Sequence, residues 1–200
     1  MNNKKLIILG AGGHGRVAAE IAEQLGYSVS FLDDTKSYNK KVVGKTSDFN
    51  KYLNGYSFFV AIGNNELRKD LLTELSESGA EIATLIHPKS AVSQNATIEK
   101  GTVIMAGAVV NSGSRIGEGC ILNTCSSVDH DCNIADFTHI SVGAHLAGNV
   151  RIGEESFVCA GATVINNISI CEKCTIGAGA VVIKDITEIG TYIGVPAVKK

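Results

Sequence analysis

A period of six residues dominates the second half of the chain. Every sixth residue from Val92 to Val182 is Ile, Leu or Val, and Ile86 extends the same phase one step earlier. Because aliphatic residues occupy roughly a quarter of the positions in globular chains, a run of this length does not arise by chance. The residue two places before each aliphatic is nearly always small, as at Ala108 and Ser126. Short strands with one large and one small inward residue before a corner have this period, so the second half is predicted to form a parallel β-helix.

The repeat resembles that of the hexapeptide-repeat acyltransferases over residues 86–182. This resemblance implies a left-handed β-helix that is triangular in cross-section, with three hexapeptides in each coil. It also implies a homotrimer.

With three strands in each coil, the residue before each aliphatic points outward on one of three faces. The first face carries Thr97, Arg115, Asn133, Arg151 and Ser169 and is expected to meet water. The second carries Val103, Ile121, His139, Phe157 and Thr175, and the third carries Ala91, Val109, Ser127, His145, Thr163 and Val181. Outward Val, Ile and Phe in a row indicate a covered surface, so we expect these two faces of neighbouring subunits to pack around a threefold axis. The packing would bring His130 of one subunit to the coil level of His139 of another, which places active sites between subunits.

Composition excludes several classes of function. The chain has 18 Lys and Arg against 20 Asp and Glu, so it lacks the basic surplus that binds nucleic acid or an anionic membrane. No apolar run approaches the ~20 residues of a membrane span, and no signal-peptide pattern is present, so we expect a cytoplasmic protein. The six cysteines are expected to be reduced, with Cys120, Cys132 and Cys174 filling the small inward position of the repeat.

The first half alternates predicted strands with predicted helices. Strands are expected over residues 5–9, 29–32, 56–62 and 82–86, and helices over 16–25 and from a cap at 63–65 to about 78. Residues 36–45 are expected to form a loop, and 47–53 one or two helical turns. Because strands that alternate with helices form parallel sheets, residues 1–85 are predicted to be an α/β Rossmann-like domain, followed by the all-β left-handed parallel β-helix over 86–200.

A glycine motif follows the first predicted strand. Gly10, Gly12 and Gly15 satisfy GxGxxG between a strand and a helix, and Asp33 and Asp34 end the second strand about 20 residues later. This context favours a nucleotide ligand whose diphosphate lies at the helix start. A tight turn that binds nothing, and an NAD site, are the less favoured interpretations.

Longer stretches narrow the resemblance within the hexapeptide-repeat family. Residues 31–34 and 58–68, followed by 123–132, 139–144 and 194–197, resemble the sialic acid O-acetyltransferase-like enzymes that N-acetylate nucleotide-linked amino sugars, including those of the bacillosamine pathway. The resemblance implies acetyl-CoA as co-substrate, a UDP-linked 4-amino-4,6-dideoxy sugar as the favoured acceptor, and no metal. The product would serve a surface glycan or protein glycosylation.

The resemblance also assigns residues. It implies a sugar-nucleotide site formed by Gly12, Gly13, His14, Asp33, Asp34, Gly63, Asn64 and Asn65. It implies acetyl-CoA contacts from His139, Gly148, Ala160 and Ala178, with Gly148 leaving room for the cofactor arm. It makes His130 the general base and Asp131 its acidic neighbour, where the typifying bacillosamine-pathway enzyme has glutamate.

The residue types suit this chemistry. An amine must lose a proton when it attacks a thioester, and an imidazole beside a carboxylate accepts a proton near neutral pH. Asp129 also flanks His130, and spacing alone does not choose between the two carboxylates. Cys125 and Cys159 lie outside the small inward position, but neither has a base at a fixed spacing, so an acyl-cysteine intermediate is less favoured.

Two rival functions stay open at the level of sequence. One is an O-acetyltransferase that acts on a sialic acid or related sugar hydroxyl. The other is a non-catalytic trimeric scaffold that binds a sugar nucleotide, against which the intact His130 and Asp131 argue.

Overall fold

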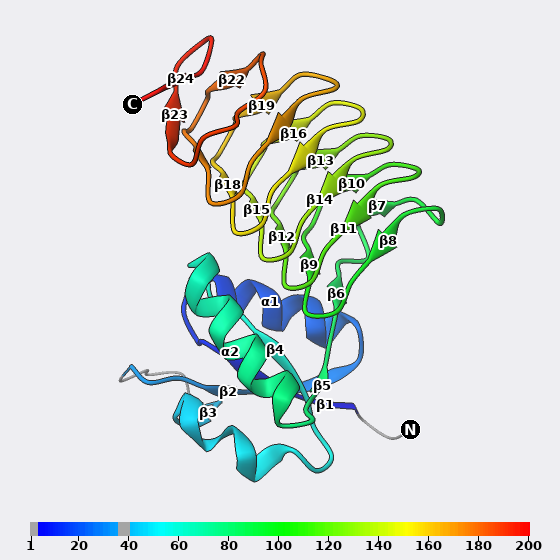
Figure 1. Ribbon diagram of the computed structural model, residues 1–200. Helices are drawn as coiled ribbons and strands as arrows, with labels where there is room; N and C mark the ends of the chain where they lie inside the picture. The colour runs from blue at the N-terminus through cyan, green and yellow to red at the C-terminus, as the bar shows by residue number, and fades with distance from the viewer. Residues whose placement is uncertain (1–3, 36–40) are drawn as a thin grey trace. The chain divides into compact units, whose positions relative to one another are not determined.

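The computed structural model in Figure 1 describes residues 4–35 and 41–200. The chain forms two compact units, Met1–Pro88 and Lys89–Lys200. The division lies slightly beyond the boundary at residues 85 and 86 that the repeat suggests.

The first unit is built on a five-stranded parallel sheet with the strand order β3-β2-β1-β4-β5. Its strands are β1 (Lys4–Leu9), β2 (Tyr27–Leu32), β3 (Val42–Gly44), β4 (Ser57–Val60) and β5 (Glu81–Ile82), and β6 (Leu85–Ile86) follows. Its helices are α1 (Gly13–Gln24), the 3-10 helix η1 (Thr46–Tyr52) and α2 (Asn65–Glu77). Strand β2 pairs with one edge of β1, and the later strand β4 pairs with its other edge. Ligands of open α/β sheets bind outside the carboxyl ends of the strands at such a reversal of order.

Continuous apolar strands supply the core of this unit. In β1, Leu6, Ile7, Ile8 and Leu9 are all fully buried, which is the pattern of a parallel strand covered on both faces. The α/β prediction for the first half is confirmed.

Three details of the first unit differ from the sequence prediction. Helix α1 begins at Gly13, inside the glycine motif, because residues 13–15 already take helical conformation. Residues 42–44 form strand β3 against β2, so the loop expected there is wrong for this part; residues 36–40 lie outside the described chain. The strand expected over 82–86 is interrupted between β5 and β6.

The second unit is the predicted β-helix (Figure 1, where the coils run from green at β7 toward red at the C-terminus). Its two-residue strands recur every six residues, and each pairs in parallel with the strand 18 positions away, as Val109 pairs with Ser127. The strands are β7 (Ala91–Val92), β8 (Thr97–Ile98), β9 (Val103–Ile104), β10 (Val109–Val110), β11 (Arg115–Ile116), β12 (Ile121–Leu122), β13 (Ser127–Val128), β14 (Asn133–Ile134), β15 (His139–Ile140), β16 (His145–Leu146), β17 (Arg151–Ile152), β18 (Phe157–Val158), β19 (Thr163–Val164), β20 (Ser169–Ile170), β21 (Thr175–Ile176) and β22 (Val181–Val182). An antiparallel pair, β23 (Thr191–Ile193) and β24 (Val198–Lys199), ends the chain.

The inward positions are filled as the repeat predicts. From Ile104 to Val182 every in-phase aliphatic is buried, and the residue two places earlier, nearly always small, is buried as well. Cys120, Cys132 and Cys174 occupy this small position and are buried free thiols.

The three faces differ in exposure. All five residues of the first face are exposed, which confirms that it meets solvent. On the second face Val103 and Ile121 are already buried within the single chain, whereas His139, Phe157 and Thr175 are half-buried. Only His139, Phe157 and Thr175 therefore support a subunit contact on this face, and the trimer stays a prediction.

Candidate active site

His130 and Asp131 lie at the corner that follows β13. Nδ1 of His130 donates a hydrogen bond to Oδ2 of Asp131 at 2.8 Å, and both side chains are exposed. Asp131 has a φ of 59°, a left-handed conformation that Asp tolerates better than most residues. Because a carboxylate only accepts hydrogen bonds, this contact fixes the proton on Nδ1 and leaves Nε2 of the neutral ring free to accept one.

The two neighbouring carboxylates act on His130 in different ways. The hydrogen bond that His130 donates to Asp131 and the charge of Asp129 raise the pKa of His130 above its ordinary 6.5. Asp129 does not touch the ring, because its Oδ1 accepts from the backbone N–H of His130 at 2.8 Å and from Nδ2 of Asn111 at 2.7 Å. Of the two candidates that spacing left open, Asp131 therefore contacts the imidazole and Asp129 fixes the backbone that carries it.

Gly148 lies one coil above His130. The next residue, Asn149, joins the two coils, because its N–H donates to the carbonyl of His130 at 2.9 Å. A Cβ added at residue 148 would lie 2.5 Å from Nε2 and 2.6 Å from Cε1 of His130. In this chain the glycine therefore makes room for the His130 ring itself, and a contact with the cofactor stays a prediction.

The other residues expected to bind acetyl-CoA lie around a different corner. His139 on β15 stacks on Phe157 with ring centroids 4.7 Å apart, and its Nε2 accepts from Nδ2 of Asn123 at 3.2 Å. Ala160 and Ala178 are exposed and occupy equivalent positions of the corner that follows β18 and β21, 18 residues apart. Within one chain, His139, Ala160 and Ala178 therefore lie apart from Gly148, which lies at the same corner as His130.

A pocket of about 530 Å³ lies in the first unit at the carboxyl ends of β1 and β4. It is lined by Gly10, Ala11, Gly12, Gly13, His14, Asp33, Thr35, Ala61, Ile62 and Gly63. Five of the eight residues expected to bind the sugar nucleotide are among these, and Asp34, Asn64 and Asn65 are not. The glycine motif and residues 61–63 thus both contribute to its lining.

The two aspartates after β2 have separate partners. Oδ2 of Asp33 accepts from the N–H of Ala11 at 2.6 Å, and its Oδ1 accepts from the N–H of Thr35 at 2.7 Å and from the Thr35 hydroxyl. Burial acts to raise the pKa of Asp33, but these hydrogen bonds outweigh it and lower the pKa. Asp34 instead accepts from the N–H and hydroxyl of Thr46. Asp33 is therefore the carboxylate that shapes the pocket.

Asn64 and Asn65 are turned toward the protein. Oδ1 of Asn64 accepts from the N–H of Leu67 at 2.9 Å and caps α2, and Oδ1 of Asn65 accepts from Nη2 of Arg68 at 2.8 Å. Their direct contact with a ligand stays a prediction, because both side-chain oxygens have structural partners here.

The three glycines of the motif have distinct roles. A Cβ at Gly10, where φ is 100°, would lie 2.9 Å from the carbonyl oxygen of Ala61, and one at Gly15 would lie 2.0 Å from that of Gly10. Gly12 faces open space, with no atom within 4 Å of an added Cβ. The first and third glycines thus permit close packing and the second leaves backbone open to the pocket, which is the division of labour in dinucleotide-binding turns.

Replacing Gly15 by Ala is expected to destabilise the protein by about 1–3 kcal/mol, because the new methyl group meets backbone that cannot move aside. Gly13→Ala is the matched control, because its Cβ meets nothing closer than Nη2 of Arg16 at 4.0 Å and Ala lowers the entropy of the unfolded chain. Thermal unfolding of the full chain should therefore show a lower Tm for Gly15→Ala and an unchanged or higher Tm for Gly13→Ala. Equal Tm values for the two variants would contradict the packing argument.

Comparisons with known proteins bear on both units. The PglD N-terminal domain family matches residues 5–75. The GDP-perosamine N-acetyltransferase of Escherichia coli O157:H7 is 32% identical over 164 residues, which are 76% of this chain and 73% of the relative. The chain belongs to the hexapeptide-repeat N-acetyltransferases of nucleotide-linked amino sugars. This confirms the resemblance that the sequence motifs indicated.

Further acetyltransferases are similar to this chain in sequence or structure. The acetyltransferase domain of PglB from Neisseria gonorrhoeae FA1090, solved in complex with acetyl coenzyme A, is 43% identical with a TM-score of 0.96, and all of both chains is covered. The UDP-N-acetylbacillosamine N-acetyltransferase of Bacillus subtilis (strain 168) is 36% identical over 112 residues. That match spans about half the length of each chain, 52% of both.

Some features of the candidate site are not evident from the motifs. Asn111 donates to Asp129 from one coil below, and only its distance of 18 residues from Asp129 could have indicated this. Arg68 lies within a motif stretch, but no pattern assigns it the contacts described below. Thr35 was missed because it has no signature of its own beside Asp33.

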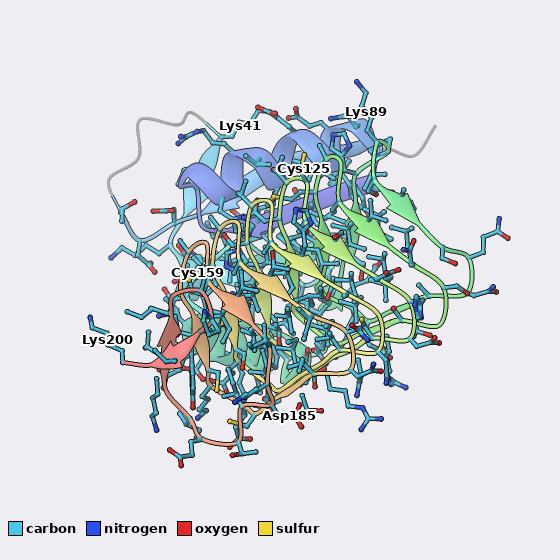
Figure 2. All side chains as sticks on the ribbon, turned by 90° about the horizontal axis from the view of Figure 1, so that it is seen from above. Lys41, Lys89, Cys125, Cys159, Asp185 and Lys200 are labelled. Atoms are coloured by element: carbon cyan, nitrogen blue, oxygen red, sulfur yellow. The ribbon has the colours of Figure 1, made fainter. Side chains whose placement is uncertain are left out.

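The two thiols that the sequence left open as acyl nucleophiles differ in exposure. Cys125 is exposed and Cys159 half-buried, and burial raises the pKa of Cys159 (Figure 2 labels both). Within residues 4–35 and 41–200, no group of three or more His, Cys, Asp or Glu side chains gathers as metal ligands would. In the same described part of the chain, no helix has the length and apolarity needed to cross a membrane.

Proposed function

We propose that this protein transfers the acetyl group of acetyl-CoA to the amine of a nucleotide-linked 4-amino-4,6-dideoxy sugar. The observation that carries the proposal is the 2.8 Å hydrogen bond between His130 and Asp131, which leaves Nε2 of an exposed imidazole as a proton acceptor. The N-acetyltransferases of amino-sugar nucleotides that match this chain support the same assignment.

The proposed reaction is a direct attack. As the sugar nitrogen forms a bond to the thioester carbonyl carbon, Nε2 of His130 accepts the amine proton. The tetrahedral intermediate then breaks its carbon–sulfur bond, the amide forms, and the CoA thiolate takes the proton back from His130. Backbone N–H groups of the β-helix are proposed to stabilise the oxyanion. The step needs neither an acyl-enzyme nor a metal.

The pocket in the first unit is proposed to hold the nucleotide. Unpaired N–H groups at the start of α1 favour an anion such as a diphosphate, and α1 begins at Gly13 beside the open backbone of Gly12. Relatives that carry UDP-linked and GDP-linked sugars in their names both match, so the proposal of UDP rests on the motif resemblance.

The proposed assembly is a homotrimer with its active sites between subunits. His130 with Gly148, and His139 with Ala160 and Ala178, lie at different corners of one chain, so a shared site requires a second chain. A cytoplasmic location is proposed because six free thiols persist in a reducing compartment.

The test is an acceptor panel. UDP-, dTDP- and GDP-linked 4-amino-4,6-dideoxy sugars are each incubated with acetyl-CoA, and the product is detected by mass spectrometry. The matched controls are the 4-hydroxy sugar nucleotides, which keep the nucleotide but lack the amine. One amine acceptor should gain an acetyl group while its hydroxyl counterpart does not. Transfer to the hydroxyl compounds alone would overturn the proposal in favour of O-acetylation.

Replacing Asp131 by Asn is expected to shift the pH profile and to lower the rate roughly tenfold. Asp131 raises the pKa of His130, and the base works only when unprotonated, so wild-type activity falls as the pH drops through this raised pKa. Without the carboxylate the pKa falls, and the acidic limb of kcat/KM should move to lower pH. Asp136→Asn removes an equal charge at another corner and should leave the limb in place. An unmoved limb in Asp131→Asn would show that Asp131 does not act on the base.

A further inference from the structure

Arg68 is a buried cation in the first unit. It lies in the first turn of α2, and only 1% of it is exposed. Its Nη1 donates to the carbonyl oxygens of Ile62 at 2.9 Å and Gly63 at 3.3 Å, and its Nη2 donates to Oδ1 of Asn65 at 2.8 Å. Because a buried charge is costly unless it is hydrogen-bonded, these contacts hold the guanidinium and the turn together.

The turn that Arg68 holds is one side of the pocket. Ala61, Ile62 and Gly63 line the pocket together with the glycine motif. Asn64 fixes the end of the same turn by capping α2. Two of the carbonyls that shape this side therefore accept from one planar group, whose fork has a fixed geometry.

His14 is the second feature that Arg68 influences. It lines the pocket, and its Nε2 is buried with no hydrogen-bond partner among residues 4–35 and 41–200. Burial and the positive charge of Arg68 lower the pKa of His14 to about 4. The ring is therefore neutral at physiological pH, and an unpaired neutral nitrogen recognises a ligand through a hydrogen bond.

We propose that Arg68 is the positioning residue of the nucleotide pocket, which sets affinity for the sugar nucleotide by holding the Ile62–Asn65 turn without touching the ligand. The inference rests on the proposed function in that the pocket is taken as the nucleotide site. A second consequence is that Arg68 excludes the imidazolium form of His14.

The test compares Arg68→Gln with Arg68→Lys in the full-length protein. Calorimetry measures the Kd of UDP, GDP and dTDP, and steady-state kinetics give the KM of each substrate and kcat. NMR follows the titration of the His14 ring, assigned with a His14→Gln variant. Arg115→Gln, an exposed arginine of the β-helix, is the matched control and should leave nucleotide affinity unchanged.

Arg68→Gln should weaken nucleotide binding about 10-fold to 100-fold and raise the pKa of His14, while the KM of acetyl-CoA stays within about twofold, because only the turn loses its anchor. Arg68→Lys keeps the charge, so His14 should still titrate well below 6.5, but one ammonium group does not reproduce the fork and nucleotide affinity should stay reduced. In Arg68→Lys, reduced nucleotide affinity together with a low pKa of His14 would separate the effect of the charge from the effect of the hydrogen bonds. A merely structural role would not produce this result.

Asn65→Ala keeps the proposal testable if Arg68→Gln fails to fold. It removes one of the three contacts and leaves the Asn64 cap, so the Kd of the nucleotide should rise severalfold. Wild-type affinity in folded Arg68→Lys and Asn65→Ala would overturn the role of Arg68. Failure of the wild type to bind UDP, GDP or dTDP would overturn the nucleotide assignment of the pocket instead.

Discussion

His130→Ala is expected to lower kcat by about 10²–10⁴-fold, because the amine loses the group that accepts its proton. The KM values of both substrates should change little, since the ring acts on the reacting nitrogen rather than on the nucleotide. Initial rates measured by chromatography of the acetylated sugar nucleotide give both constants without a thiol reagent.

His145→Ala is the matched control for this variant. His145 lies on β16, which pairs with β13, the strand before the His130 corner. Its ring shares a hydrogen bond with the Ser127 hydroxyl at 2.8 Å, so the variant also removes one imidazole from the β-helix. It should retain kcat within a few-fold. A His130→Ala enzyme as fast as this control would show that another group deprotonates the amine.

Gly148→Ala is expected to reduce kcat roughly 100-fold while Tm changes little. The new Cβ would lie 2.5 Å from Nε2 of His130, and the ring, whose side chain is 60% exposed, can swing into solvent to relieve the contact. The fold is then spared, but the imidazole leaves Asp131, and a displacement of about 1 Å at a reacting group can cost this factor.

The displacement has a signature of its own. A ring that has left Asp131 has a lower pKa, so the acidic limb of kcat/KM should move to lower pH in Gly148→Ala, as in Asp131→Asn. Asn166→Ala alters the same corner one coil further along and should have neither effect. Wild-type kcat together with an unmoved limb in Gly148→Ala would mean that the glycine does not serve His130.

Most of the β-helix could be predicted because each coil repeats one local rule. A large and a small inward residue every six positions specify both the strand and its corner. Once Val110 and Ile140 are assigned to the inward position, the direction of the residues around them follows. The short strand β3 could not be predicted in this way, since its three residues have no periodicity and owe their conformation to pairing with β2.

The candidate site residues were found in two ways. The family resemblance pointed to His130 and Asp131, and motif spacing pointed to the glycine turn, because each of these features is contiguous in sequence. The direction of a side chain depends on partners that only the fold supplies, as with Asn65, which turns to Arg68. The packing of Gly148 against the His130 ring was missed for the same reason, because it joins residues of adjacent coils.

The most direct test of the account is the nature of the bond formed. Acetyl-CoA labelled at the carbonyl carbon is turned over with the accepted amino sugar nucleotide, and the isolated product is examined by NMR. The account predicts that the labelled carbon is an amide bonded to the sugar nitrogen, and that His130→Ala yields almost none of it. A labelled ester on a sugar oxygen, or equal yield of amide from His130→Ala, would contradict it.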